Sequence, residues 1–167
     1  MKSPRLRRFF VSLFALIGLS VHFLGREDDG LSYSRTDFKF RTYSVPPGKG
    51  FYTGVHCENR TVDHVVSLKD AYESGASKWS DQLKQKFAND RMNHVPACSR
   101  INSAKGSLRP SDLVRISKDR NGVDFILQDL CSYLEIYRRV KEEYALTTSK
   151  NDPQLFRECG ISLQAGI

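Results

Sequence analysis

The spacing of apolar residues predicts helices in the middle and the C-terminal part of the chain. The strongest pattern begins near Asp124, where apolar side chains at spacings of four and three residues give one continuous helical face. Its members are Ile126, Leu130, Tyr133, Tyr137, Val140 and Tyr144. A second helix is predicted near Ser77, with Trp79, Leu83 and Phe87 spaced to pack into a core. Both helices are interpreted as packing elements.

Three shorter stretches have the composition of β-strands. Residues 37–43 alternate between apolar and polar side chains, whereas residues 51–57 and 61–66, on either side of a polar turn at residues 58–60, are rich in aromatic or β-branched residues. The second and third stretches predict a small β-hairpin. Asp63 and His64 would then lie on or at the end of a strand.

Local signals complete a mixed α+β fold. Ser67 is expected to cap a short helix that ends at Gly75. Residues 98–104 predict another short helix, with Gly106 as its end, and residues 109–122 are polar and indicate a loop. We therefore expect one α+β domain with a small hairpin and a short helix at its centre, surrounded by packing helices.

The N-terminus is expected to direct export. Basic residues before residue 9, followed by an apolar run, are typical of a secretory signal, so residues 1–25 are predicted as a signal peptide. An uncleaved membrane anchor is the alternative, although the run is short for a membrane span. Residues 26–50 are predicted as an N-terminal arm and residues 51–167 as the functional domain. The protein would be secreted or periplasmic.

The charge distribution suits a polyanionic partner. The full chain carries a net charge of +7, of which residues 1–25 contribute four positive charges, leaving +3. Residues 78–120 contain ten Lys or Arg and four Asp, a local net charge of +6. A concentrated basic segment of this kind is typical of proteins that bind nucleic acid, although an ordinary solvated surface has the same appearance.

The four cysteines predict two disulfides. Cys57, Cys98, Cys131 and Cys159 include no C-x-x-C pair, which argues against a structural zinc site. An even number behind an export signal favours two bridges, with three possible connectivities. One of these, Cys57 with Cys98, would tie together the two halves of the candidate site.

Three residues suggest metal-assisted phosphodiester hydrolysis. This reaction needs a base that activates water and a cation that stabilises charge on the phosphate. Asp63 and Asn102 offer the oxygen ligands that Mg²⁺ or Mn²⁺ prefers, and His64 offers a neutral imidazole near pH 7. Neighbouring side chains on a strand point to opposite faces, so Asp63 and His64 can share a site only near a strand end or bend.

The order of these motifs resembles the HNH endonucleases of the ββα-metal superfamily. The resemblance rests on Asp63-His64-Val65-Val66, Phe87-Ala88-Asn89-Asp90, Asn93, and Asn102-Ser103-Ala104-Lys105-Gly106, and covers about residues 57–110. It implies a ββα-metal core with His64 as general base and Asp63 and Asn102 as metal ligands. Asn93 would orient the imidazole of His64. Lys105 would lie near the phosphate.

Other residues are assigned with less support from the motif. Arg100 and Arg60 are predicted as further substrate contacts. His56 and His94 compete with His64 for the role of base. His56 lacks an adjacent acid, and His94 occupies a position that the family usually leaves apolar, so both are expected to have structural or substrate-contact roles.

The sequence thus predicts an exported, monomeric, metal-dependent endonuclease that hydrolyses DNA with low sequence specificity, with RNA as an alternative substrate. No base-reading motif is apparent, which favours contacts with the nucleic-acid backbone. Two alternatives remain open. One is a secreted nucleic-acid-binding module without catalytic activity, and the other is a nuclease toxin restrained by an acidic inhibitor protein.

Overall fold

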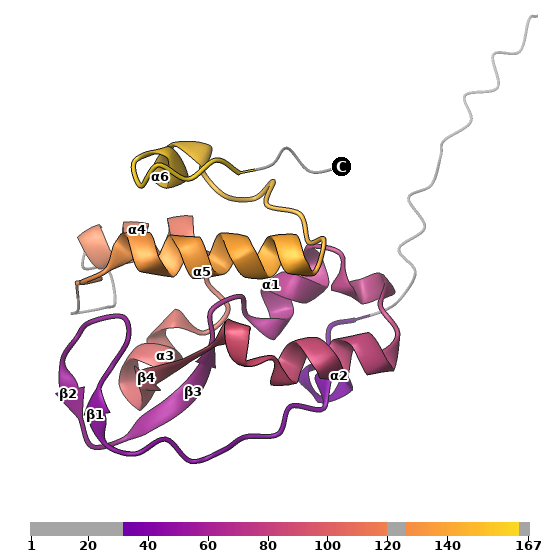
Figure 1. Ribbon diagram of the computed structural model, residues 1–167, viewed down its shortest axis with the longest axis horizontal. Coiled ribbons are helices and arrows are strands. Elements are labelled where there is room, and N and C mark those ends of the chain that lie inside the picture. The colour runs from indigo at the N-terminus through magenta and orange to yellow at the C-terminus, as the bar shows by residue number, and fades with distance from the viewer. Residues whose placement is uncertain (1–31, 120–125, 164–167) are drawn as a thin grey trace, which may run out of the picture. The chain divides into compact units, whose positions relative to one another are not determined.

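The computed structural model describes residues 32–119 and 126–163, with the side chains of Lys118 and Asp119 left out (Figure 1). The predicted signal peptide, the start of the arm and the region near Asp124 lie outside the described residues. Short antiparallel strand pairs and surrounding helices make the fold α+β, as the sequence predicts. Among the described residues, no helix is both long and apolar enough to cross a membrane.

The candidate site is built on the strand pair β3 (Arg60–His64) and β4 (His94–Cys98). The two strands run antiparallel, with Arg60 opposite Cys98 and His64 opposite His94. Helix α3 (Ser99–Lys105) follows β4 without a linker and packs on both strands. It ends at Gly106, whose φ of 48° is left-handed, as the sequence predicts. The order of these three elements is β–β–α (Figure 1).

The predicted pairing of neighbouring strands is wrong. Residues 51–53 form a turn, closed by a 2.8 Å hydrogen bond from Gly54 N to Gly50 O, and only β2 (His56–Cys57) is extended. Strand β2 pairs with β1 (Gly48–Lys49), whereas β3 pairs with the distant β4. The sequence hides β4 because Pro96 lies in its centre, and proline normally argues against a strand. A disulfide between Cys57 and Cys98, one of the three connectivities that the sequence leaves open, fastens this region.

The predicted strand at residues 37–43 is also absent. A 3-10 helix η1 (Arg35–Phe38) forms there and ends at Lys39, whose φ of 46° turns the chain. The alternation arises because Phe38 is fully buried, with its ring 6.3 Å from that of Phe87, while Phe40 packs beside His64. The arm therefore serves to cover the core and the candidate site.

The helices α1 and α2 follow two serine caps. Ser67 accepts a hydrogen bond from Asp70 N at the start of α1 (Leu68–Glu73), which confirms the predicted cap. Ser80 caps α2 (Asp81–Asn89), so Trp79 precedes this helix, after the 3-10 helix η2 (Ala76–Lys78). Another 3-10 helix, η3 (Arg91–Asn93), leads into β4.

The predicted loop at residues 109–122 is wrong over most of its length, because α4 occupies Pro110–Asp119. Pro110 starts this helix, where the missing amide hydrogen is harmless. Leu113 and Val114 are buried, and this apolar face packs the helix against the core. The polar residues around them in the sequence explain why the sequence predicts a loop.

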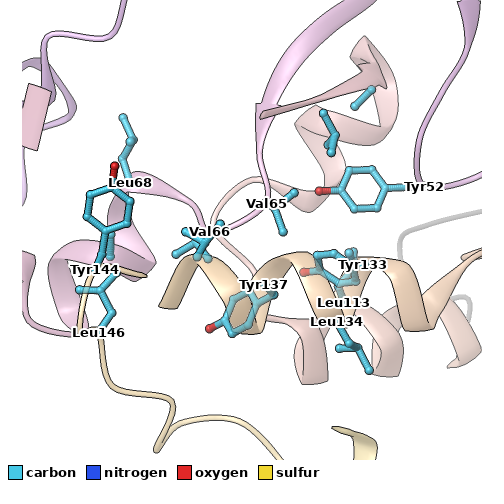
Figure 2. Packing of buried hydrophobic residues seen from close by; sticks show 14 of the residues in the cluster. Tyr52, Val65, Val66, Leu68, Leu113, Tyr133, Leu134, Tyr137, Tyr144 and Leu146 are labelled. Carbon is cyan, nitrogen blue, oxygen red and sulfur yellow. The ribbon is translucent and has the colours of Figure 1, made fainter. Parts of the chain in front are cut away.

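The predicted long C-terminal helix is confirmed as α5 (Leu130–Glu143), capped by Asp129. Tyr133, Tyr137 and Val140 are buried as expected, whereas Ile126 is 70% exposed and does not belong to the apolar face. Figure 2 shows Tyr133 and Tyr137 on α5, in the buried cluster that also contains Val65 and Val66. A second disulfide, Cys131–Cys159, ties α5 to the residues after α6 (Pro153–Arg157).

A buried ionic cluster joins α1 to α5. Asp70 on α1 is 2% exposed and lies 3.1 Å from Lys141 Nζ, 2.9 Å from Arg109 Nε and 2.7 Å from the Tyr137 hydroxyl. Lys141 is 1% exposed and also donates to Ser74 Oγ at 2.6 Å. The cluster orients α1, and therefore the chain that leaves the candidate site, relative to α5.

Candidate functional site

Asp63, His64 and Asn102 line one pocket of about 450 Å³. Asp63 and His64 are the last two residues of β3, and Asn102 comes from the middle of α3. Both residues line the pocket, although their side chains have different neighbours: the Asp63 carboxylate lies against Tyr52 and Lys105, and the His64 ring lies against Ala88 and His94. The remaining lining residues are Tyr33, Arg35, Val62, Ser67, Leu68, Lys69, Ser103, Gly106 and Ser107.

The backbone of α2 determines which nitrogen of His64 can accept a proton. His64 Nε2 lies 2.8 Å from the carbonyl oxygen of Ala88. A carbonyl only accepts hydrogen bonds, so we assign the hydrogen of His64 to Nε2, which places the lone pair of the neutral ring on Nδ1. Nδ1 has no hydrogen bond within the described parts of the chain. Burial lowers the pKa of His64 from 6.5 to about 3, against the opposing effect of the Ala88 hydrogen bond, so the ring is neutral at pH 7.

Asn93 does not make the predicted contact with the His64 imidazole. Its amide oxygen accepts from Val66 N at 2.8 Å, and its amide nitrogen donates to Val66 O at 3.0 Å. Its backbone oxygen accepts a further hydrogen bond from Val65 N at 2.9 Å. Asn93 is fully buried and fixes the backbone directly after His64. It therefore positions the candidate base indirectly, and Ala88 O orients the ring.

Asp63 is buried in a set of hydrogen bonds. Tyr52 donates to its Oδ2 at 2.5 Å, and Lys105 Nζ lies 3.1 Å from Oδ2 and 3.3 Å from Oδ1. Lys105 also donates to His64 O at 2.8 Å. Lys105 is fully buried, so its ammonium group holds the strand end. Burial and the nearby Asp63 raise the pKa of Tyr52 well above its usual value, so Tyr52 stays a donor.

Asn102 completes an oxygen-rich donor pair. Its amide nitrogen donates to Thr61 Oγ1 at 2.9 Å and to Val62 O at 3.3 Å. These bonds assign the nitrogen and leave the oxygen, Oδ1, available to a ligand. A carboxylate and an amide oxygen beside an open pocket fit a hard cation that keeps several water ligands. The described residues contain no cluster of three or more His, Cys, Asp or Glu that could hold a metal ion, so such a site depends on Asn102 and water.

The two predicted arginine contacts have different surroundings. Arg60 donates to the backbone oxygens of Pro46, Lys49 and Pro47 at 2.6, 2.8 and 3.3 Å, so its guanidinium group holds the arm against β3. A substrate would have to displace these bonds. Arg100 lies exposed in the first turn of α3, on the helix that carries Asn102.

The sequence does not identify several residues that line or support the site. Ala88 contributes only a backbone oxygen, which no side-chain pattern reveals. Arg35 from the arm and Lys69 from α1 line the pocket, and no motif in their segments distinguishes them from other exposed basic residues. His94 is expected to have a structural or substrate-contact role, and the sequence does not reveal that its Nε2 lies 3.2 Å from His64 Nε2. Its position opposite His64 follows only from the long-range pairing of β3 with β4.

Two comparisons with known proteins find no match, and a third finds a similar sequence. The chain matches no protein-family model, and no solved structure matches it. It is 30% identical over 90 residues to an uncharacterized secreted protein of the fungus Arthroderma benhamiae. The match covers 53% of this chain and 40% of that protein, so the chain spans well under half the length of its relative.

Proposed function

We propose that the protein is an exported, metal-dependent endonuclease of the HNH type. One observation carries the proposal. Asp63, His64 and Asn102, which the motif resemblance links across 39 positions of sequence, line the same pocket at the end of a β–β–α unit. A resemblance in sequence order alone would not require these residues to line one pocket.

In the proposed reaction, His64 removes a proton from the attacking water. Nε2 is held by Ala88 O, so Nδ1 is the atom that takes the proton. Asp63 and Asn102 Oδ1 would hold the cation, with Tyr52 and Lys105 fixing the carboxylate. A divalent cation there would stabilise charge on the phosphate and the leaving oxygen. Asn93 keeps the backbone after His64 in place.

The pocket has the charge that a nucleic-acid backbone requires. Arg35 and Lys69 are exposed at its lining and supply two cationic groups that can contact phosphates. Backbone contacts of this kind are independent of sequence, which agrees with an enzyme of low sequence specificity. Arg100 and the basic segment at residues 78–120 would extend this interaction.

Export is supported by two features. The structure contains two disulfides, which persist mainly in oxidising compartments, and the similar fungal protein is described as secreted. The predicted signal at residues 1–25 supplies the route. We propose that the mature domain acts outside the cytoplasm.

An inactive nucleic-acid-binding module is the second candidate. The observation in its favour is the Asp63–Lys105 ion pair, because a buried ammonium group already neutralises the carboxylate that would bind the cation. In such a protein the fold and the cationic pocket would remain, and cleavage would not occur with any divalent ion.

The two candidates differ in a metal-dependent cleavage assay. The mature chain is incubated with plasmid DNA in Mg²⁺, in Mn²⁺ or in EDTA, together with the variants Asn102→Ala and Asn59→Ala. The nuclease proposal predicts cleavage that EDTA abolishes and a higher metal requirement for Asn102→Ala. The exposed Asn59 is the matched control and should behave as the wild type. DNA binding without cleavage under all conditions would favour the inactive module.

A further inference from the structure

Two imidazoles converge beside the candidate site, and the proposed hydrolysis uses only that of His64. His64 Nε2 and His94 Nε2 lie 3.2 Å apart. Ala88 O lies 2.8 Å from the first nitrogen and 3.0 Å from the second. The three atoms come from the end of β3, the start of β4 and the last turn of α2, so the fold itself brings them together.

The spacing of the two nitrogens suits a tetrahedral metal ion. Zinc binds histidine nitrogen at about 2.0–2.1 Å, and a tetrahedral angle then separates two such nitrogens by about 3.3 Å. Without an ion, the same contact is a hydrogen bond that needs a hydrogen on one of the two rings. We propose that His64, His94 and the Ala88 carbonyl form a binding site for Zn²⁺ or a chemically similar transition-metal ion, with water completing the coordination.

The site differs in chemistry from the Asp63 and Asn102 donor pair. Imidazole nitrogens favour zinc and other later transition metals, whereas carboxylate and amide oxygens favour Mg²⁺ and Mn²⁺. The two kinds of ion would therefore select different atoms in adjacent places. His64 belongs to both arrangements, since it would be the base in one and a ligand in the other.

The surroundings of the pair resemble the outer shell of a metal site. The Tyr43 hydroxyl lies 3.3 Å from His94 Nδ1, the nitrogen that a metal bound at Nε2 would leave to a hydrogen-bond partner. Arg91 lies over the Tyr43 ring, 3.7 Å from its centre, and restrains it. Phe40 packs edge-on against both imidazoles, with ring centres 4.6 Å from His64 and 5.5 Å from His94. His94 is only partly buried, which gives an ion access.

Zinc binding would make the site sensitive to a second metal. An ion on His64 Nε2 displaces the hydrogen that Ala88 O now accepts and ties the ring to His94. If the protein is a nuclease as proposed, zinc would then inhibit cleavage in Mg²⁺. This inhibition rests on the proposed function, whereas zinc binding itself does not.

Titration calorimetry of the mature protein with Zn²⁺, without nucleic acid, tests the binding directly. One ion should bind per chain, and His94→Leu should weaken the affinity at least tenfold. His56→Leu is the matched control, because His56 lies exposed on β2, away from the pair. Absence of zinc binding to the wild type, or an equal affinity in His94→Leu, would overturn the proposal.

A second variant keeps the proposal testable if His94→Leu does not fold. Tyr43→Phe removes one hydroxyl from a partly exposed ring and should weaken zinc binding by about tenfold or more, as changes to a metal's outer shell do. Unchanged affinity in both variants would contradict the assignment. Zinc binding without any nuclease activity would refute only the proposed function, and cleavage without zinc binding would refute only this inference.

Discussion

Replacement of Asp70 by asparagine should destabilise the protein far more than most single substitutions. The carboxylate is 2% exposed and accepts hydrogen bonds from Lys141, Arg109, Tyr137 and Ser74. Asparagine keeps the shape but removes the negative charge, so the ammonium group of Lys141 stays buried without a counter-ion. Breaking a buried pair in this way costs about 3–5 kcal/mol. That amount is a large part of the stability of a small domain.

The free energy of unfolding can be measured by urea titration with both disulfides intact, using circular dichroism. Asp81→Asn is the matched control, because Asp81 pairs with Lys39 at 3.4 Å in an exposed position. An exposed pair contributes under about 1 kcal/mol. The double variant Asp70→Asn/Lys141→Met should recover part of the loss, because it removes both charges together. A loss below about 1 kcal/mol for Asp70→Asn, or strictly additive effects, would refute the reasoning.

The pH dependence of this loss gives a second check. Burial lowers the pKa of Lys141 from 10.5 to about 8, against the opposing effect of Asp70. Without Asp70, the pKa should fall further. The folded variant then sheds its proton at a lower pH than the unfolded chain, so its stability rises with pH. We therefore expect the loss to be smaller at pH 9 than at pH 7.

Three further predictions concern the site and its support. The pKa of His64 falls from 6.5 to about 3 on folding, so the unfolded chain binds more protons than the folded chain between these pH values. The free energy of unfolding should therefore decrease from pH 6.5 to pH 3 by up to about 5 kcal/mol. In urea titrations His64→Gln should flatten this pH dependence, and an unchanged slope would contradict the prediction. The double variant Arg35→Gln/Lys69→Gln should raise KM with little change in kcat, and should reduce the salt dependence of DNA binding by roughly one to two ions; an unaltered salt slope would exclude these side chains as phosphate contacts. Replacing Cys57 and Cys98 by alanine opens a loop spanning 41 positions and should cost about 4 kcal/mol, measured by urea unfolding, whereas a loss under about 1 kcal/mol would show that β3 and β4 need no such link.

The sequence predicts local features of this protein well. The apolar face of α5, the Ser67 cap and the end of α3 at Gly106 depend on residues close together in the chain. Their physical causes are helical periodicity, a side-chain acceptor for a free amide, and the left-handed backbone that glycine tolerates. Each of these causes acts within a few residues of the chain, so each feature can be predicted from the local sequence without knowledge of the fold.

The features that the sequence does not reveal depend on distant partners. Strand β4 forms because β3 lies beside it, although Pro96 argues against a strand. Helix α4 depends on the burial of Leu113 and Val114 among polar neighbours. The sequence around Lys105 is typical of an exposed lysine near a helix end. In the folded chain, the packing of α3 against Asp63 buries Lys105 completely. These contacts join segments that are far apart in the sequence, so the local sequence of each segment does not predict them.

The candidate site shows the same division. The residues Asp63, His64 and Asn102 can be named from the motif order, and they do line one pocket. Their supporting groups are different, since Ala88 O orients His64 where the motif assigns Asn93 to that task. A backbone oxygen has no identity in the sequence, so only the folded chain reveals it.

The rate of plasmid cleavage by His64→Ala, compared with the wild type and with His56→Ala in the same Mg²⁺ buffer, tests the central claim most directly. Removal of a general base lowers the rate by about 10²–10⁴-fold. If His64 is the base, His64→Ala should lose activity by this factor, with His56→Ala close to the wild type and both variants folded by circular dichroism. Cleavage by His64→Ala at the wild-type rate would contradict it.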